Sequence, residues 1–380
     1  MLNYEFPPIG GGAGMAHKAL LGKYARSADL HVDVLTSGRR PGLTTERPAA
    51  NISITRVGID KKDLHHWRRF EVLQWLRRAR GHYRRMLDEN DYALVHAFFG
   101  FPTGWLCYRT AGRIPYILSL RGSDVPGPNL RLQLEYKLLG PVFRAIWRNA
   151  ASIVACSEGL RRRALAFMPG IDVSVIPNGV DLRRFHPAAG RGADETLRLL
   201  TVGRLSNTKR IDRLIEAVAI LRGQGRRVAL KIVGGGPLET ELRRLVTDRR
   251  LDAVVHIVGR AEGGRMPAIY RDSDVFVSAS MQEGMSNAML EAMATGLPIV
   301  TTRCEGVEEL IADNGMVLDD DSPRTIATAV AELADHREKT EGLSAAAVAR
   351  AAQFGWSAVA EKYLELYRKI AQADPTRRPR

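Results

Sequence analysis

The sequence predicts an α/β protein made of two doubly wound parallel-sheet domains. Short apolar, β-branched runs alternate with longer helical patterns along the whole chain, which is typical of parallel α/β architecture. A chain of 380 residues is long enough for two domains of ordinary size. Its 45% hydrophobic and 26% charged residues are those of a globular protein and exclude a disordered one.

Each half of the chain has its own series of expected strands. In the first half they are Leu2–Phe6, His31–Thr36, Ile52–Val57, Ala93–His96, Ile117–Leu120, Ile153–Cys156 and Val173–Ile176. In the second half they are Leu197–Val202, Ala229–Val233, Val254–Val258, Val275–Val277, Ile299–Thr302 and Gly315–Val317. Helical patterns such as Arg210–Arg222 and Leu238–Asp248 lie between them.

The turn-forming cluster Pro177–Asp181 stands between two strand signals and predicts the domain boundary. We therefore expect a first domain at 1–177 and a second at 178–355, with a helix at about 356–374 that packs back on the first. Ligands of open α/β sheets bind at the carboxyl ends of the strands, so we look for the chemistry in the loops that follow strands.

The three cysteines, Cys107, Cys156 and Cys304, are widely spaced and odd in number. They exclude a disulfide scaffold or a zinc finger and favour a reducing, cytoplasmic setting. The sequence has no apolar run of spanning length, and its first residues lack the features of a signal peptide.

The positive charge is concentrated in the first half. Residues 1–180 hold 26 Lys and Arg against 14 Asp and Glu, whereas residues 181–380 hold 30 against 28. The basic half is therefore expected to face an anionic partner, such as a phospholipid surface, a phosphorylated acceptor or nucleic acid.

The segment 278–294 holds the sharpest motif. A strand leads into a loop with Glu283, and a helix is expected to begin near Ser286 or Asn287, with its N–H groups and positive dipole end suited to a diphosphate. Glu283 could accept hydrogen bonds from sugar hydroxyls, and Glu291 from a ribose. An ordinary strand–loop–helix crossover with two solvated carboxylates is the alternative.

Three further loops follow strands in this half. Arg204 and Lys209 could together hold the two phosphates of a nucleoside diphosphate. The turn 234–237, Gly-Gly-Gly-Pro, could let a flat ligand approach the backbone, or it could simply end a strand. Arg260, after the next strand, could serve a base through its main chain.

Taken together, these motifs resemble glycosyltransferase family 4, a retaining family with the GT-B fold, whose two Rossmann-like domains face each other across a crevice. The resemblance covers nearly the whole chain and is strongest from about 176 to 318. It implies that Arg204 and Lys209 bind the donor pyrophosphate, that Glu283 contacts the donor sugar and that Glu291 contacts the ribose. It also assigns further donor-binding positions, namely Gly11, Gly12, Gly203, Gly235, Gly236, Arg260, Gly284, Met285, Ser286 and Asn287.

In the first half, the loop with Gly11 and Gly12 lacks the spacing of a dinucleotide-binding fingerprint, because Met15 stands at the last glycine position. It resembles the family's glycine loop, whose N–H groups meet the donor phosphates; a plain turn is the alternative. His96, Arg121 and Asp124 are expected on the acceptor or sugar side. Many relatives have a histidine where Arg121 stands, so that role does not transfer directly, and His96 is equally well interpreted as structural.

The segment 61–87 is strongly basic, and an apolar stripe recurs in it at helical spacing. Together with Trp67, Phe70 and Trp75 it predicts an amphipathic helix of the kind found on anionic membrane surfaces. A helix whose stripe packs on the sheet while its arginines face solvent is equally consistent. Nucleic acid is not expected, because no known nucleic-acid-binding module is present.

The sequence as a whole therefore predicts a retaining, hexosyltransferase-type enzyme. We expect it to use no metal or cofactor, a nucleoside diphosphate sugar donor with UDP favoured, and a glycan or lipid-linked acceptor. A cytoplasmic protein, peripheral on the membrane, is expected. The alternatives are an anionic-lipid or nucleic-acid binding protein on a Rossmann scaffold, and a nucleotide-sugar epimerase of the same fold.

Overall fold

The computed structural model describes residues 1–61, 63–64, 67–127, 133–188, 196–261 and 263–373. The chain divides into two compact units, each described by itself below. The first unit comprises Met1–Asn178 together with Trp356–Arg380, and the second comprises Gly179–Gly355. The predicted boundary at Pro177–Asp181 coincides with the first passage of the chain between them.

The described part of the first unit contains an eight-stranded sheet in the order β3-β4-β2-β1-β5-β6-β7-β8. Every neighbouring pair is parallel except β3 with β4. The strands are β1 (Leu2–Asn3), β2 (Val32–Gly38), β3 (Gly42–Ala49), β4 (Ile52–Gly58), β5 (Val95–Phe98), β6 (Tyr116–Ser119), β7 (Ser152–Ala155) and β8 (Ser174–Val175).

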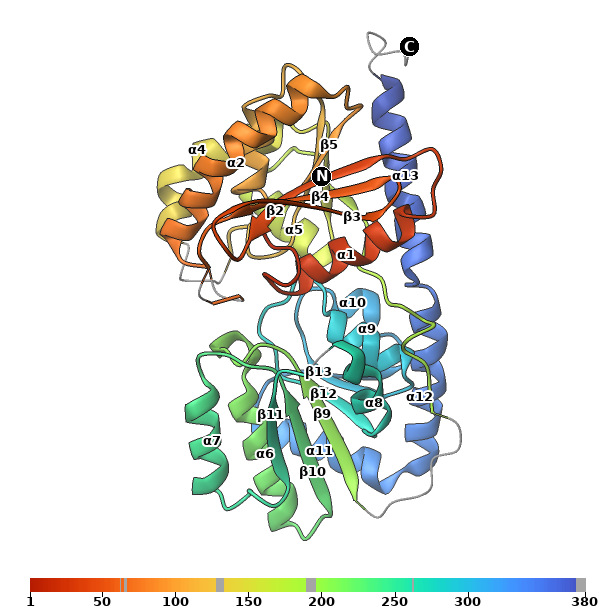
Figure 1. Ribbon diagram of the computed structural model, residues 1–380. Coiled ribbons are helices and arrows are strands. Elements are labelled where there is room, and N and C mark those ends of the chain that lie inside the picture. The colour runs from red at the N-terminus through yellow and green to blue at the C-terminus, as the bar shows by residue number, and fades with distance from the viewer. Residues whose placement is uncertain (62, 65–66, 128–132, 189–195, 262, 374–380) are drawn as a thin grey trace. The chain divides into compact units, whose positions relative to one another are not determined.

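The helices of the first unit are α1 (Gly12–Tyr24), α2 (Arg69–Glu89), α3 (Thr103–Tyr108), α4 (Gln133–Arg148), α5 (Glu158–Phe167) and α13 (Trp356–Ala373). Helix α13 lies beside α1 (Figure 1), and its Trp356, Tyr363 and Tyr367 belong to the same apolar core as α1. The C-terminal helix therefore completes the first unit. Residue 374, the predicted end of this helix, lies outside the described residues.

The described part of the second unit contains a six-stranded parallel sheet in the order β11-β10-β9-β12-β13-β14. Its strands are β9 (Leu197–Val202), β10 (Val228–Val233), β11 (Val255–Gly259), β12 (Val275–Ser278), β13 (Ile299–Thr302) and β14 (Gly315–Leu318). Its helices are α6 (Ile211–Gly223), α7 (Glu239–Asp248), α8 (Met266–Arg271), α9 (Asn287–Ala294), α10 (Val307–Leu310), α11 (Pro323–Asp335) and α12 (Arg337–Ala352), with short 3₁₀ turns at Asn207–Lys209 and Gly263–Arg265.

Helix α6 illustrates why these elements form. Its buried side chains, at positions 211, 214, 215, 218 and 221, recur every three or four residues, so one face packs into the core of the second unit. The central strands are buried along their full length, as expected for a parallel sheet covered on both faces. The prediction of two doubly wound parallel-sheet domains is thus confirmed.

The sequence missed strand β3, which pairs antiparallel with β4 at the edge of the first sheet. Seven of its eight residues are exposed, so it lacks the alternation of buried and exposed residues that identifies a strand. Pro48 lies within it, and proline is tolerated there because an edge strand need not donate every N–H. The first predicted strand, Leu2–Phe6, was too long, since β1 ends at Asn3.

Candidate functional site

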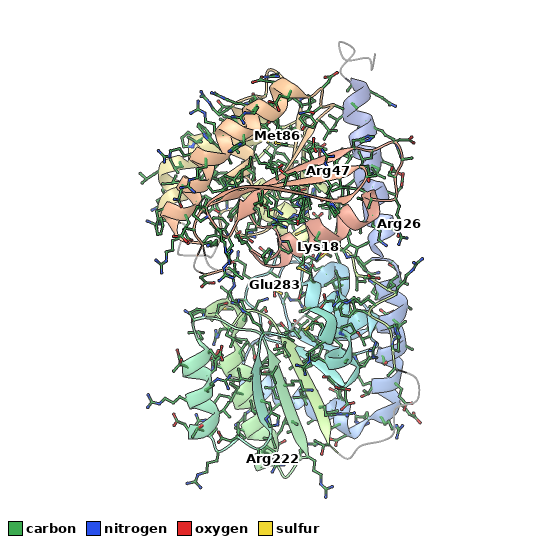
Figure 2. All side chains as sticks on the ribbon, in the orientation of Figure 1. Lys18, Arg26, Arg47, Met86, Arg222 and Glu283 are labelled. Atoms are coloured by element: carbon green, nitrogen blue, oxygen red, sulfur yellow. The ribbon has the colours of Figure 1, made fainter. Side chains whose placement is uncertain are left out.

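The candidate residues of the second unit lie in loops at the carboxyl ends of neighbouring strands. From β9 the chain winds to β10 and β11 on one side of the sheet, and then returns to β12 on the other side of β9. The order of strands thus reverses between β9 and β12, and open α/β sheets bind ligands at such a switch point. Figure 2 shows Glu283 at this end of the unit and Arg222 at the opposite end.

An ion pair bridges the switch point. The Lys209 ammonium, which follows β9, donates a hydrogen bond to the carboxylate of Glu283, which follows β12. The two side chains are 21% and 15% exposed, so the pair is accessible from solvent. Arg204 is exposed and has no hydrogen-bond or ion-pair partner among the described residues. Two cations, Arg204 and Lys209, and one carboxylate, Glu283, are therefore accessible to a ligand at this edge of the sheet.

The backbone holds these two loops against each other. The Met281 N–H donates to the Thr208 carbonyl at 2.9 Å, next to Lys209 in the chain. Arg210 has a left-handed backbone (φ 47°), and its guanidinium lies 2.9 Å from the Asp321 carboxylate. Arg210 and Asp321 cannot be recognised from the sequence, because an Arg beside a Lys at the start of a helix gives no signal of a special backbone conformation.

The glycine turn after β10 serves the packing of loops. A Cβ on Gly234 would lie 1.8 Å from the Gly203 carbonyl oxygen, and one on Gly236 would lie 2.3 Å from the Leu205 carbonyl oxygen. A Cβ on Gly235 would meet the Arg260 side chain at 3.0 Å. These glycines thus let the loops after β9, β10 and β11 pack closely, which accounts for the turn without a ligand.

Helix α9 begins as the sequence predicts. Ser286 is its N-cap, and the Ser286 hydroxyl accepts a hydrogen bond from the Met289 N–H at 3.3 Å. Met285 is 6% exposed and packs against Gly306, whereas Gly284 and Asn287 are half-buried. The first turn of α9 therefore follows directly on the loop that carries Glu283.

Glu291 lies one turn further along α9 and is half-buried. Burial raises its pKa to about 7, while a hydrogen bond from the Tyr270 hydroxyl (2.9 Å) and the charge of Arg184 oppose the rise. Tyr270 and Arg184 were not predicted from the sequence, because both are far from α9 in the chain. This carboxyl group changes its charge close to neutral pH.

In the first unit, Gly11 is the N-cap of α1 and Gly12 is its first residue. The preceding Gly10 has φ +99°, and a Cβ there would lie 2.6 Å from the Cβ of Glu5. A Cβ on Gly14 would lie 2.5 Å from the Glu5 carbonyl oxygen. The glycines at positions 10 and 14 are therefore needed where the loop folds back on the end of β1, and Gly11 and Gly12 stand between them.

His96 lies within β5 and is 1% exposed. Its Nδ1 is hydrogen-bonded to the Tyr367 hydroxyl (2.6 Å) and its Nε2 to the Ser119 hydroxyl (2.7 Å). Burial, helped by the charge of Arg121, holds the His96 pKa well below its usual value. These contacts give His96 the structural role that the sequence left open, since it links α13 to the sheet. A contact with an acceptor would require these bonds to break.

Arg121 and Asp124 follow β6. The Arg121 guanidinium donates to the Asn178 side-chain oxygen (2.9 Å) and lies over the Phe98 ring, 4.6 Å from its centre. Asp124 is 8% exposed and accepts hydrogen bonds from the N–H groups of Arg121 and Gly100, each at 2.8 Å. Burial raises the Asp124 pKa, although these hydrogen bonds counteract it. Asp124 thus shapes the loop after β6, whereas Arg121 reaches Phe98 of β5 and Asn178, and its buried Nε has no hydrogen-bond partner among the described residues.

Most of the basic segment 61–87 forms helix α2. Residues 62 and 65–66 of this segment, which precede α2, lie outside the described residues. Its buried stripe, formed by positions 71, 75, 79, 83 and 87, packs α2 against β2 and β4. The expectation of interfacial tryptophans was wrong: Trp67 is 8% exposed and Trp75 is fully buried, and both rings lie near Tyr4. Phe70, in contrast, is 59% exposed.

The described residues contain no group of three or more His, Cys, Asp or Glu side chains arranged to hold a metal ion. None of the helices they form combines the length and the apolar character needed to cross a membrane.

Comparison with protein families gives two matches that together span most of the chain. Residues 11–184 match the family described as Glycosyltransferase Family 4, and residues 196–336 match Glycosyl transferases group 1. The chain is 31% identical to a D-inositol 3-phosphate glycosyltransferase of Kineococcus radiotolerans, over 75% of this chain and 73% of that protein. It is 30% identical to a GDP-mannose-dependent alpha-(1-6)-phosphatidylinositol monomannoside mannosyltransferase of Mycobacterium tuberculosis, over 75% and 78%.

Solved structures share the fold. Sucrose-phosphate synthase from Thermosynechococcus elongatus superposes with a TM-score of 0.82 at 21% identity, covering 96% of this chain and 94% of that one. Anabaena Alr3699/HepE in complex with UDP-glucose gives a TM-score of 0.76 at 18% identity, covering 97% and 98%. The two parallel-sheet domains therefore have the GT-B fold. The sequence matches show that the chain is a glycosyltransferase belonging to family 4.

Proposed function

We propose that this enzyme transfers a hexosyl group, with retention of configuration, from a UDP-sugar to a hydroxyl of a lipid-linked or cell-envelope glycan. The observation that carries the proposal is the Lys209–Glu283 pair at the switch point of the second sheet, with Arg204 exposed beside it. The second unit would bind the donor and the first unit the acceptor.

In this mechanism the Lys209 ammonium exchanges its ion pair with Glu283 for one with the donor diphosphate, because two phosphate groups attract it more strongly than one carboxylate. Glu283 is then free to accept a hydrogen bond from a sugar hydroxyl. The bond between the anomeric carbon and the diphosphate oxygen breaks as the acceptor oxygen attacks on the same face. The acceptor proton passes to the departing diphosphate, whose charge Arg204, Lys209 and the first turn of α9 stabilise.

Because these cations supply the charge that a divalent ion supplies elsewhere, we propose that transfer needs no metal. Turnover should persist after dialysis against EDTA. An activity lost in EDTA and restored by Mg²⁺ or Mn²⁺ would contradict this point while leaving the donor site in place.

The donor base is tested by titrating UDP, GDP and ADP into the protein by calorimetry. Support for UDP comes from the similarity to HepE, whose solved complex contains UDP-glucose. GDP-mannose is the second candidate, because a relative with 30% identity is a GDP-mannose-dependent mannosyltransferase. Tight binding of GDP without binding of UDP would select the second candidate. Binding of none of the three nucleotides would remove the proposed donor site.

We propose an anionic acceptor and a peripheral position on the cytoplasmic face of a membrane, through segment 61–87. The names of two relatives contain a phosphorylated inositol, and the first unit has 32 Lys and Arg against 17 Asp and Glu. Sedimentation with liposomes tests the contact: anionic vesicles should bind the protein and neutral ones should not. Changing Arg77, Arg84 and Arg85 to Gln should weaken binding. Arg78 is kept, because its guanidinium donates to the Gly58 carbonyl at 2.6 Å.

A further inference from the structure

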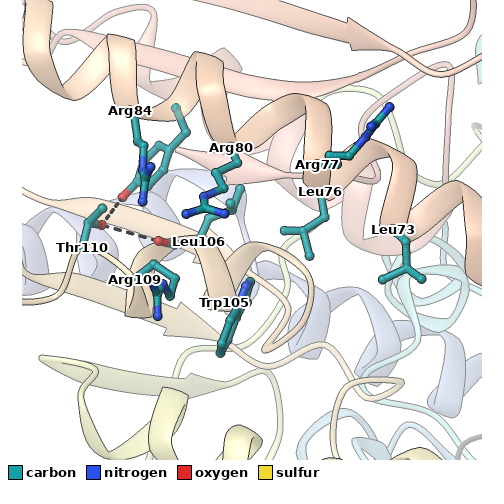
Figure 3. Close-up of a pocket in the computed structure, with 10 residues that line it drawn as sticks. Leu73, Leu76, Arg77, Arg80, Arg84, Trp105, Leu106, Arg109 and Thr110 are labelled. Atoms are coloured by element: carbon teal, nitrogen blue, oxygen red, sulfur yellow. Dashed lines mark hydrogen bonds between the residues drawn. The ribbon is translucent and has the colours of Figure 1, made fainter.

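A cavity of about 410 Å³ lies between α2 and α3 in the first unit (Figure 3). None of the predicted acceptor-side residues, His96, Arg121 and Asp124, lines it, and no role has been given to it so far. Its volume is within the range of small-molecule sites, about 300–1,000 Å³.

One part of the cavity wall is apolar. Leu106 of α3 is 2% exposed and forms the floor, while Leu76 and Trp105 are half-buried and Leu73 is 58% exposed at the rim. The floor is held in place by a hydrogen bond of 2.9 Å between the Tyr83 hydroxyl of α2 and the Thr110 hydroxyl that follows α3. A preformed apolar surface thus extends from the rim to the floor, which is the shape that a hydrocarbon chain requires.

The other part of the wall is cationic. Arg77, Arg80 and Arg84 are spaced three and four residues apart on α2 and line the cavity together with Arg109, the residue that follows α3. In Figure 3 the side chains of Arg80 and Arg84 extend towards Arg109, whereas that of Arg77 turns away from it. All four are exposed, and in the part of the chain that the structure describes no carboxylate pairs with any of them. Arg80, Arg84 and Arg109 therefore have no counter-charge and repel each other, and an anion would relieve that repulsion.

We propose that this cavity binds a single anionic lipid molecule. Its phosphate lies between Arg80, Arg84 and Arg109, and the first part of its hydrocarbon chain lies against Leu73, Leu76 and Trp105. Arginine is suited to the phosphate because its planar group donates two parallel hydrogen bonds. The inference rests on the proposed membrane contact of this surface. It adds that one lipid molecule is bound in the cavity, beyond the general attraction between the basic surface and anionic lipids.

The apolar and cationic halves together determine the class of ligand. Inorganic phosphate would leave the apolar wall in water, and a neutral amphiphile would leave Arg80, Arg84 and Arg109 without an anion. Each would satisfy half of the site, so an anionic amphiphile should bind more tightly than either. This difference in affinity distinguishes a specific lipid-binding site from a surface that merely attracts anions.

The test uses the full chain and a soluble probe, dodecyl phosphate below its critical micelle concentration, titrated by calorimetry. Dodecyl maltoside and inorganic phosphate are titrated in parallel. We expect dodecyl phosphate to bind at least about tenfold more tightly than both, since the loss of one strong interaction costs about tenfold in affinity. Equal affinity for dodecyl phosphate and dodecyl maltoside, or for dodecyl phosphate and inorganic phosphate, overturns the proposal.

Variants locate the binding. Arg80→Gln with Arg84→Gln should weaken dodecyl phosphate at least about tenfold, and Leu73→Gln should weaken it less. Arg26→Gln with Arg47→Gln removes the same charge from exposed positions that neither line the cavity nor belong to segment 61–87, and Arg26 lies well away from α2 in Figure 2. If the control pair weakens binding as much as the cavity pair, the cavity is not the site.

Vesicle sedimentation separates this inference from the proposed membrane contact. Binding to anionic vesicles without affinity for dodecyl phosphate would keep the surface contact and overturn the cavity. Affinity for dodecyl phosphate that the cavity pair abolishes, without vesicle binding, would support the cavity and overturn the membrane contact. Neither result changes the calorimetry of UDP, which reports on the second unit.

Discussion

At the strands of the first unit, His96, Arg121 and Asp124 are hydrogen-bonded to the protein itself, whereas at those of the second unit Arg204 is exposed and Lys209 meets Glu283 at the surface. The charge of the two units differs as well. The first has 32 Lys and Arg against 17 Asp and Glu, and the second has 24 against 25. The nearly neutral unit concentrates its chemistry in a few cations at one sheet edge, while the basic unit distributes charge over an outer surface.

A polar residue at the end of a strand therefore indicates a binding site only when its hydrogen-bond and ion-pair partners are known. A side chain whose donors and acceptors are already used supports the fold, and one that is exposed or paired with a single replaceable partner is available to a ligand. On this criterion we expect the reactive chemistry in the second unit.

The largest effect is expected for the two cations of the second unit. Lys209→Ala and Arg204→Ala should each reduce turnover about 100-fold or more, because both stabilise a diphosphate whose charge grows in the transition state. Arg222→Ala is the matched control, since Arg222 is an exposed arginine at the opposite end of the same unit (Figure 2). Steady-state rates of folded variants measure the effect, and wild-type rates for either cation variant would remove the donor site from this edge.

In the first unit, His96→Leu should destabilise the fold by about 2 kcal/mol, because the Tyr367 and Ser119 hydroxyls would lose their shared partner. His31→Leu, at an exposed position, is the control. Urea unfolding gives the stability, and calorimetry of UDP gives the donor affinity. We expect stability to fall and UDP affinity to remain. A stable variant with impaired transfer would instead place His96 on the acceptor side.

Substitutions of Glu283 and Glu291 in the second unit should affect different steps, transfer and nucleotide binding. Glu291→Ala should weaken free nucleotide about tenfold, because a ribose would lose its acceptor, whereas Glu283→Ala should spare free nucleotide and depress transfer. Glu241→Ala, on the exposed face of α7, is the control. Equal loss of nucleotide affinity in both variants would contradict this division.

The smallest expected effect is the pH dependence of folding stability that Glu291 contributes. Burial raises the Glu291 pKa to about 7 from an ordinary value of 4.5, so the folded protein holds this proton more tightly than the unfolded chain does. Stability from this group is therefore full below about pH 4.5 and is lost as pH rises towards 7. Glu291→Gln should stabilise the protein by about 1 kcal/mol at pH 8 and hardly at all at pH 4.5.

Nucleotide binding should show the opposite trend. The ionised Glu291 is the better acceptor for ribose hydroxyls, so UDP affinity should fall as pH is lowered through about 7. Calorimetry across this range measures it, and Glu291→Gln should remove the pH dependence. An unchanged dependence in that variant would assign the titration to another group.

The sequence predicted the parallel strands of both sheets, and central strands such as β12 and β13 gave the clearest signal because they are buried apolar runs. It could not reveal β3, whose residues are exposed and polar, and it misjudged Trp67 and Trp75, because an aromatic near a basic stripe can face either lipid or core. At the site, the motifs identified Lys209 and Glu283, and the order of the strands explains why they meet. The partners of Glu291 and the cavity between α2 and α3 arise from residues distant in the chain, which periodicity does not detect.

The return of the chain to the first unit affects how the protein is made. Residues 179–355 form a unit whose two ends lie side by side, since the Val180 N–H donates to the Phe354 carbonyl at 2.8 Å. On a ribosome this unit can close as soon as it has emerged, whereas the first unit, although its residues 1–178 are translated earlier, lacks the Tyr363 and Tyr367 contacts until α13 has been made. His96 and Ser119 stay without these partners until then, so the second unit can be complete before the first.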